Sequence, residues 1–382
     1  MAKSSVAPIP LSVPSAAVAP LVAPTAPRPV SLLDYERMAA SRLPKMAYDY
    51  FASGSGDEVA LRRNREAFER VTLRYRVLRG VGVPDTSVEL LGRRHAMPVV
   101  IAPTAFMCLA HPDGEIAVAR AAAAAGVTQG LSTLSTRSLE DVARAAPGPK
   151  WFQLYVFRDR GLTESLVRRS EDAGYEALVV TVDAPVLGTR EADVRNRFSL
   201  PPGMFPENLM NDETRRVLAS GEASGLAQYF AARIDPSLTW ADIDWLRSVT
   251  RLPVLVKGLV RGDDAAEAVA HGAAGIVVSN HGGRQLDSAP AGIDAMTEVA
   301  AAVAGRVPIL MDGGVRRGVD VVKAISRGAN AVLVGRPVLW GLAAGGEDGV
   351  GDVLEILRAE FAQTMALCGC RTVGEIGPDL IS

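Results

Sequence analysis

The 382-residue chain is poor in cysteine, in histidine and in net charge. Its three cysteines, Cys108, Cys368 and Cys370, are too few and too poorly spaced for a disulfide framework or a zinc site. We therefore predict reduced thiols in a cytoplasmic protein without a metal centre. The formal net charge of -2 and the lack of a long basic run argue against a nucleic-acid-binding surface, so we expect a small-molecule partner.

Long apolar runs are also missing, since no segment approaches the ~20 apolar residues that a membrane-spanning helix needs. Residues 1–30 are rich in Ala, Pro, Val and Ser, and their repeated prolines would break a membrane helix or the apolar core of a signal peptide. We predict a disordered tail over residues 1–30 and one folded domain over residues 31–382. Because 48% of the residues in the whole chain are hydrophobic, the chain can bury a large core.

Helical patterns begin directly after the tail. Ser31 is a suitable N-cap for a first helix, because Asp34 follows three residues later and apolar residues then share one face. The pattern predicts a second helix from Pro44 to about Ser53 and a third over residues 57–68. The alternation over residues 71–77 predicts a strand.

From Met97 onward, short apolar segments alternate with helical stretches. Strands are predicted at residues 98–105, 127–132, 151–155, 177–183, 253–257, 273–280, 307–314 and 330–335. Eight such units in this order predict parallel pairing in a (β/α)8 TIM barrel. An open doubly wound sheet is the alternative, but no GxGxxG motif follows the first strand. The long interval over residues 184–239 interrupts the alternation, and we predict a lid there over the strand ends.

The most informative motif, SNHGGRQLD, occupies residues 279–287 and follows the sixth barrel strand. His281 can take a proton at neutral pH, and Arg284 presents a planar fork that suits a carboxylate. Gly282 and Gly283 let the backbone turn sharply and leave room for a flat ligand. A glycine turn that carries a histidine by chance is the competing interpretation.

Polar or glycine residues also follow the other strands, at the end where such a barrel carries its active site. Each has a structural interpretation by itself, because Thr181 can bond to backbone, Asp183 can cap a turn and Lys257 can lie at the surface. Their occurrence at all eight strand ends favours a functional site. The other candidates are Pro103, Thr104, Ala105, Ser132, Gln153, Tyr155, Arg190, Ser279, Asp312, Gly313, Gly314, Arg316, Gly335 and Arg336.

Glycine-rich turns after strands seven and eight predict a ligand that carries a phosphate. Barrels of this type hold phosphate there through backbone N–H groups and helix N-termini, and Arg316 and Arg336 lie nearby in the sequence. Residues at the other strand ends could bond the polar edge of a ring, which leaves His281 facing a substrate on the opposite side.

These residues resemble those of the FMN-dependent α-hydroxy acid oxidase family, which includes glycolate oxidase, lactate oxidase and mandelate dehydrogenase. The resemblance runs from about Ser31 to Ile376 and rests on LPKMAYDYFASG, IAPTA, FQLYV, TVDAPVLGTRE, VLVKG, SNHGGRQLD, MDGGVRRG and VGRP, in family order. It implies FMN as cofactor, oxidation of a 2-hydroxy acid to the 2-oxo acid, and reoxidation by O2 with formation of H2O2. It also implies a homo-oligomer, with a tetramer as the expected form.

The resemblance further implies a role for each candidate. Tyr50, Arg190 and Arg284 would bind the substrate carboxylate, and Tyr155 would bond its hydroxyl. His281 would accept a proton while Asp183 steadies the imidazolium. Lys257 would stabilise charge on the reduced flavin. The residues implied to contact FMN are Pro103, Thr104, Ala105, Ser132, Gln153, Tyr155, Thr181, Lys257, Ser279, Asp312, Gly313, Gly314, Val315, Arg316, Gly335 and Arg336.

One position departs from the short-chain members of that family. Where glycolate oxidase has tryptophan after the turn of strand two, this chain has Leu134, with Phe106 and Met107 as apolar neighbours. The extra space predicts an aryl substrate such as (S)-mandelate or hydroxymandelate. The charged loop after strand four predicts a soluble enzyme, unlike the membrane-bound mandelate dehydrogenases. The alternatives are a lactate or glycolate oxidase, a Schiff-base enzyme that uses Lys257, and an FMN- or phosphate-binding barrel with a silent site.

Overall fold

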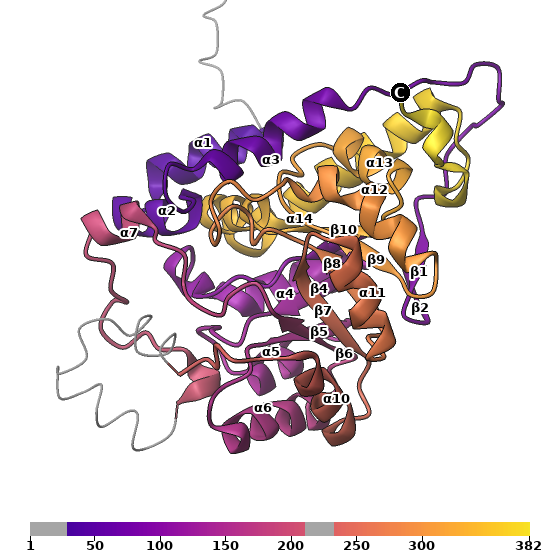
Figure 1. Cartoon of the computed structure of the whole chain (residues 1–382). Coiled ribbons are helices and arrows are strands. Elements are labelled where there is room, and N and C mark those ends of the chain that lie inside the picture. The colour runs from indigo at the N-terminus through magenta and orange to yellow at the C-terminus, as the bar shows by residue number, and fades with distance from the viewer. Residues whose placement is uncertain (1–28, 211–232) are drawn as a thin grey trace, which may run out of the picture.

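The computed structural model describes residues 29–210 and 233–382, so nearly all of the predicted tail lies outside the described residues. Three helices precede the barrel and lie along the top of Figure 1. They are α1 (Leu32–Arg42), α2 (Lys45–Ala52) and α3 (Val59–Arg70). The backbone N–H of Asp34 donates to Ser31 Oγ and that of Ser31 donates to Asp34, so α1 begins at the predicted cap.

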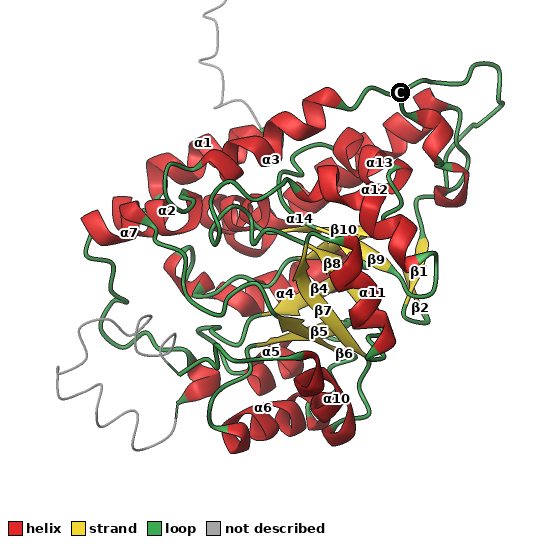
Figure 2. Cartoon of the chain, viewed as in Figure 1, coloured by secondary structure: helices red, strands yellow, loops and turns green. Residues whose placement is uncertain are grey.

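Eight parallel strands close into a barrel with the neighbour order β10-β3-β4-β5-β6-β7-β8-β9. They are β3 (Val99–Ile101), β4 (Thr128–Leu131), β5 (Lys150–Leu154), β6 (Ala177–Thr181), β7 (Val254–Leu259), β8 (Gly275–Val278), β9 (Ile309–Met311) and β10 (Ala331–Val334). Helices cover the outside of the barrel (Figure 2). The strands are buried almost throughout, because an apolar cluster that includes Trp151, Leu255 and Leu310 also fills the interior. The predicted (β/α)8 barrel is confirmed.

Helices accompany the barrel strands along the chain. They are α4 (Gly114–Ala125), α5 (Leu139–Ala145), α6 (Arg160–Asp172), α10 (Trp240–Val249), α11 (Gly262–Ala270), α12 (Gly292–Val303), α13 (Gly318–Ser326) and α14 (Arg336–Cys368). Buried alanines on α4 allow close packing against α14. The backbone of α14 is not helical at Gly345 and Gly346, so α14 consists of two helices joined by a kink.

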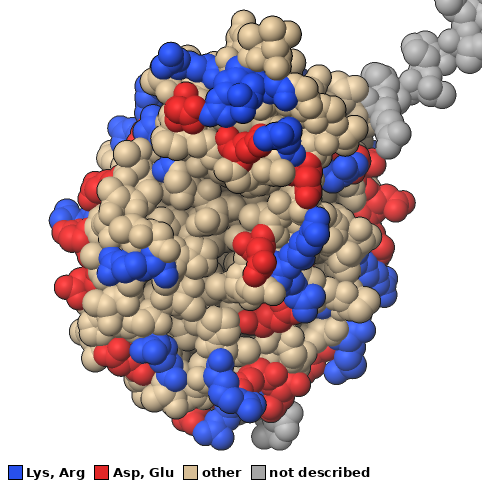
Figure 3. All heavy atoms as spheres, turned by 90° about the vertical axis from the view of Figure 1, so that its right-hand side faces the viewer, with Lys and Arg blue, Asp and Glu red and all other residues tan. Residues whose placement is uncertain are grey.

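A short hairpin covers the N-terminal end of the barrel. Its strands are β1 (Val88–Leu90) and β2 (Arg93–His95), and Leu90 packs in an apolar cluster with Trp151 and Leu255 of the barrel interior. The sequence did not reveal this hairpin, because three-residue strands are too short to show a two-residue period. Figure 3 shows the side of the molecule that lies at the right of Figure 1, where charges of both signs surround a largely uncharged, hollowed middle.

The strand predicted over residues 71–77 is wrong. This segment is extended, but within the described part of the chain its only bridge joins Leu73 to Ile381. Tyr75 and Val77 are 71% and 67% exposed, so the alternation of side chains does not mark a buried sheet face. Alternation indicates an extended backbone, whereas a strand also needs a neighbouring edge to pair with.

The interval between β6 and β7 contains α7 (Glu191–Arg195) and the 3-10 helix η2 (Glu207–Leu209). Its first part folds against α2, beside which α7 lies in Figure 1. The ring of Phe198 stacks on Tyr50 with 4.3 Å between centroids, and Asn196 Nδ2 donates to Asp49 at 2.7 Å. The predicted lid falls partly on residues 211–232, which lie outside the described residues. No helix in the described part of the chain is long and apolar enough to span a bilayer.

Candidate active site

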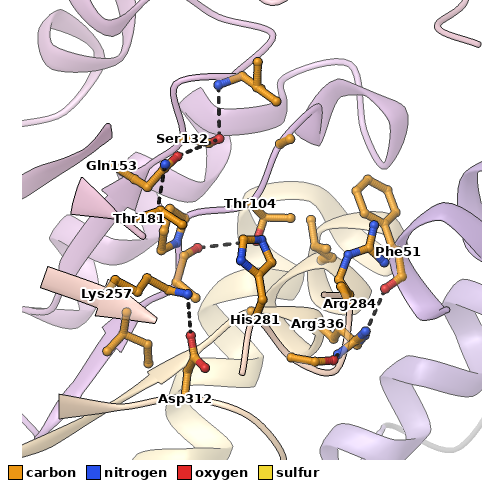
Figure 4. Close-up of a pocket in the computed structure, with 18 of the residues that line it drawn as sticks. Phe51, Thr104, Ser132, Gln153, Thr181, Lys257, His281, Arg284, Asp312 and Arg336 are labelled. Carbon is orange, nitrogen blue, oxygen red and sulfur yellow. Dashed lines mark hydrogen bonds and ion pairs between the residues drawn. The ribbon is translucent and has the colours of Figure 1, made fainter. Parts of the chain in front are cut away.

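A pocket opens at the C-terminal ends of the barrel strands, next to α2. It contains about 1260 Å³ of empty space, counting its open mouth. Figure 4 shows the central side chains, which come from different strand ends and face a common cavity. The predicted residues that line it are Tyr50, Pro103, Thr104, Ala105, Ser132, Leu134, Gln153, Tyr155, Thr181, Arg190, Lys257, His281, Arg284, Asp312, Gly313, Gly314, Val315, Gly335 and Arg336.

His281 follows β8 and has a left-handed backbone conformation, with φ of 58°. Its backbone N–H donates to Ser279 Oγ at 3.0 Å, and its Nδ1 lies 2.8 Å from Asp183 Oδ1. Burial raises the pKa of Asp183, but the charges of His281 and Lys257 outweigh burial and leave this pKa below its usual value. An ionised Asp183 holds the proton on Nδ1, which leaves Nε2 as the proton acceptor.

Two arginines and a tyrosine form a cationic wall beside His281. Arg284 donates to the carbonyl oxygens of Tyr50 and Ser53 at 2.7 and 2.8 Å, and its guanidinium lies over the Tyr50 ring at 5.1 Å from the centroid. Burial, together with the positive charge of Arg190, lowers the pKa of Arg284 to about 10. Arg190 Nε is buried without a hydrogen-bond partner within the described residues. A carboxylate would relieve both the charge repulsion and the unpaired donor.

Lys257, at the end of β7, is fixed between two oxygen atoms. Its Nζ donates to Ser279 Oγ at 2.9 Å and lies 3.1 Å from Asp312 Oδ2. Burial lowers the pKa of Lys257, but Asp312 and Asp183 raise it by more, so the net shift is upward. A lysine that stays protonated is a poor nucleophile, and this pairing argues against Schiff-base chemistry.

Side chains are hydrogen-bonded in a row across the ends of β4, β5 and β6 (Figure 4). Ser132 Oγ donates to Gln153 Oε1 at 3.3 Å, and Gln153 Nε2 donates to Thr181 Oγ1 at 3.1 Å. Leu134 is part of the same loop, because its backbone N–H donates to Ser132 Oγ at 3.1 Å. The N–H of Phe106 donates to the Leu134 carbonyl at 3.2 Å. The loop after β4 therefore contributes both to the polar row, through Ser132, and to an apolar wall of the pocket, through Leu134.

Turns rich in glycine follow β9 and β10. Gly313 and Gly314 have φ of 89° and 88°, in the left-handed region that favours glycine. Burial, together with the charges of Arg284 and Arg316, lowers the pKa of Arg336 to about 9. Arg336 itself begins α14. Crowded cations beside a helix N-terminus indicate an anionic ligand.

Comparison with known proteins decides the family. The profile of the FMN-dependent dehydrogenases matches residues 39–382. The chain belongs to this family. The chain is 52% identical over 352 residues to an L-lactate oxidase of Nostoc sp. (strain PCC 7120 / SAG 25.82 / UTEX 2576), covering 91% of this chain and 96% of the relative. It is 51% identical over 346 residues to Glycolate oxidase 3 of Arabidopsis thaliana, covering 91% and 94%.

Solved structures of the same family superpose closely on this FMN-dependent dehydrogenase. A mandelate oxidase with (S)-4-hydroxymandelic acid has a TM-score of 0.87 and 46% identity, covering 92% of this chain and 98% of that structure. A further crystal structure of mandelate oxidase has a TM-score of 0.85 and 46% identity, covering 93% and 98%. The predicted family and the predicted cofactor, FMN, are both confirmed.

The residues of the pocket fit FMN. The turn at Gly313 and Gly314 and the guanidinium group of Arg336 suit its phosphate, and the row of side chains from Ser132 to Thr181 suits the polar edge of its ring. Lys257 supplies a fixed positive charge. The contacts of individual residues with FMN stay predictions.

The structure places three predicted residues behind the pocket. Asp183 reaches it through His281, Ser279 reaches it through Lys257, and the side chain of Arg316 lies outside the lining. Several apolar positions in the lining were not predicted, because no motif chemistry distinguishes them in the sequence. They are Phe51, Leu187, Ile234, Val334 and Leu339.

Proposed function

We propose that this FMN-dependent enzyme oxidises (S)-2-hydroxy acids with an aryl side chain, such as mandelate or 4-hydroxymandelate, to the 2-oxo acids, with O2 as electron acceptor. The observation that carries the aryl preference is the wall beside the cationic site. The Phe106 ring lies 5.8 Å from the Tyr50 ring, and the backbone of Phe106 is bonded to that of Leu134. An aryl group packs well against such aromatic and aliphatic surfaces.

The substrate carboxylate is held by Arg284 and Arg190. Both cations are withdrawn from water, so a bidentate ion pair there is strong and fixes the orientation of the 2-carbon. Tyr155 lines the same cavity, and burial first and the charge of Asp183 second raise the pKa of its phenol. Tyr155 therefore stays a neutral hydroxyl that can hydrogen-bond the substrate oxygen.

His281 Nε2 takes one proton from the substrate's CH–OH group. Asp183 accepts from Nδ1 and stabilises the imidazolium that results. Lys257 keeps its positive charge because of Asp312, and it offers that charge at the ring-binding side of the pocket. Bound FMN would supply the acceptor for the two electrons and the second proton, and O2 would be the final electron acceptor, giving H2O2.

Lactate or glycolate oxidation is the second candidate. Its support is the identity of 52% and 51% to proteins named L-lactate oxidase and glycolate oxidase, which exceeds the 46% identity to the mandelate oxidase structure. Overall identity and the pocket wall therefore favour different substrates. Because a single apolar group discriminates by only about 1–3 kcal/mol, we expect a graded preference between the two classes.

The experiment is a substrate panel with purified protein. We expect yellow protein whose flavin is bleached anaerobically by (S)-mandelate, with kcat/KM for mandelate and 4-hydroxymandelate above that for glycolate and lactate, and with H2O2 formed in air. The R enantiomers serve as matched controls and should react poorly. Colourless protein that cannot be reconstituted with FMN would contradict the function, and flavin that no 2-hydroxy acid bleaches would favour a binding protein.

A further inference from the structure

A pair of buried asparagines lies between the two chemical parts of this site. Asn64, in the middle of α3, and Asn280, directly before His281, are 2% and 5% exposed. Asn64 Nδ2 donates to Asn280 Oδ1 at 3.0 Å, and Asn280 Nδ2 donates to Asn64 Oδ1 at 2.8 Å. This reciprocal pair joins residues 216 positions apart in the sequence.

Asn280 holds the histidine turn, which we define as residues 279–283. Its Oδ1 also accepts from the N–H of Gly283 at 3.1 Å, and its Nδ2 also donates to the carbonyl of Pro290 at 3.0 Å. The left-handed conformation of His281 is strained for a residue with a side chain, and it persists only where surrounding contacts impose it. Asn280 supplies two such contacts, to Gly283 and Pro290, which both follow His281 in the chain.

Asn64 contacts the glycine turn, which we define as Gly313 and Gly314. A Cβ on Gly313 would lie 3.2 Å from the side-chain atoms of Asn64, and a Cβ on Gly314 would overlap the Asn64 carbonyl. The next residue, Arg65, donates to the Gly314 carbonyl and lies 3.0 Å from Asp320 at the start of α13. One turn of α3 therefore supports the glycine turn directly.

We propose that the Asn64–Asn280 pair is a positioning device that couples the phosphate end of the FMN site to His281. The inference rests on the proposed function. An ordered glycine turn fixes Asn64, and the reciprocal amide pair then fixes the histidine turn. A residue that only caps a turn would need one hydrogen bond. In this pair, each side-chain amide both donates to and accepts from the other, and the pair links two loops to a helix. Neither residue lines the pocket, so both act through other groups.

The test uses Asn64→Ala in the full chain, measured against Thr128→Val. Thr128 is buried at the opposite end of the barrel, where its Oγ1 lies 2.7 Å from His95 Nε2, so this control also removes a buried hydrogen bond. For each variant we would measure the Kd of the apoprotein for FMN, the anaerobic flavin-reduction rate at saturating FMN and mandelate, and Tm. We expect both variants to have a lower Tm than the wild type. Only Asn64→Ala should also raise the Kd for FMN and slow flavin reduction, with a change of roughly tenfold in each quantity.

Two further variants keep the test decisive. Asn64→Asp preserves the side-chain shape but places a carboxylate beside Asn280 Oδ1 and the glycine turn, so it should weaken FMN binding more than Asn64→Ala. Asn280→Ala combined with Asn64→Ala should cost less than the sum of the two single losses, because the pair acts as a unit. Wild-type FMN affinity or a wild-type reduction rate in Asn64→Ala would overturn the coupling. A wild-type enzyme that mandelate does not reduce would instead reject the proposed function.

Discussion

The two ends of the barrel treat a histidine in opposite ways. At the N-terminal end, His95 is buried, its Nδ1 lies 3.0 Å from the Arg93 carbonyl and its Nε2 lies 2.7 Å from Thr128 Oγ1. At the C-terminal end, His281 is half-buried, and of its ring nitrogens only Nδ1 has a partner within the described residues, the Asp183 carboxylate. A ring with both nitrogens occupied holds structure together, whereas a ring with one free nitrogen can take a proton.

The same contrast extends to the surroundings of each histidine. Burial lowers the pKa of His95, which favours the neutral imidazole beside the apolar cluster that includes Leu90 and Trp151. Around His281, the buried atoms Asp183 Oδ2 and Asp312 Oδ1 have no hydrogen-bond partner within the described residues. Unpaired buried oxygens are costly in a rigid core, and two such carboxylate oxygens beside His281 suit a site that receives a ligand.

The largest expected effect comes from His281→Asn. Removal of the proton acceptor should slow anaerobic flavin reduction by about 10²–10⁴-fold, while FMN content stays unchanged. Stopped-flow absorbance with (S)-mandelate measures the rate. His95→Asn is the matched control and should lower Tm with a normal reduction rate. Rapid reduction in His281→Asn would mean that another group takes the proton.

The next effect concerns the apolar cluster around Leu90 at the N-terminal end of the barrel. Leu90→Ala removes a buried side chain from the apolar cluster and should cost about 2–5 kcal/mol of unfolding free energy. Urea denaturation measures the loss, and steady-state kinetics of the remaining folded enzyme should match the wild type. Altered kcat or KM would show that the two ends are not independent.

A smaller effect is expected for Arg284→Lys. An ammonium group cannot reproduce the planar fork that binds a carboxylate, so kcat/KM should fall by roughly 10- to 100-fold with FMN still bound. Arg358→Lys is the control, because Arg358 pairs with Glu355 on the exposed side of α14. Kinetics equal to wild type would remove Arg284 from the carboxylate site.

The smallest effect is a change of preference. Leu134→Trp should fill the space beside Phe106 and lower the ratio of kcat/KM for mandelate over glycolate by about tenfold. Leu134→Met, which conserves volume, should leave this ratio nearly unchanged. If glycolate is the better substrate of the wild type and Leu134→Trp changes nothing, the pocket-wall argument fails, although the flavin chemistry can still hold.

The barrel and most of the pocket were predictable because both depend on short-range signals. Apolar runs separated by helical stretches indicate parallel strands, and barrel topology then collects the residues at strand ends. Asn64 could not be found this way, because within α3 it looks like any polar helix residue. Its role appears only when the loop after β8 folds onto that helix. Leu187 and Ile234 lie in the irregular interval, where sequence pattern specifies no position.

The helices before the barrel have a consequence for synthesis on the ribosome. Carbonyls of Phe51 and Ser53 accept hydrogen bonds from Arg336, which lies 285 and 283 positions later in the chain. The first segment of the site to leave the ribosome therefore cannot form these hydrogen bonds until one of the last segments has been synthesised. A nascent chain cannot complete its cofactor site until α14 has emerged, so flavin capture is expected as a late event, after the barrel has closed. Nascent chains arrested before Gly335 should accordingly not bind FMN, so the flavin fluorescence should stay unchanged, whereas full-length chains should bind FMN and change it.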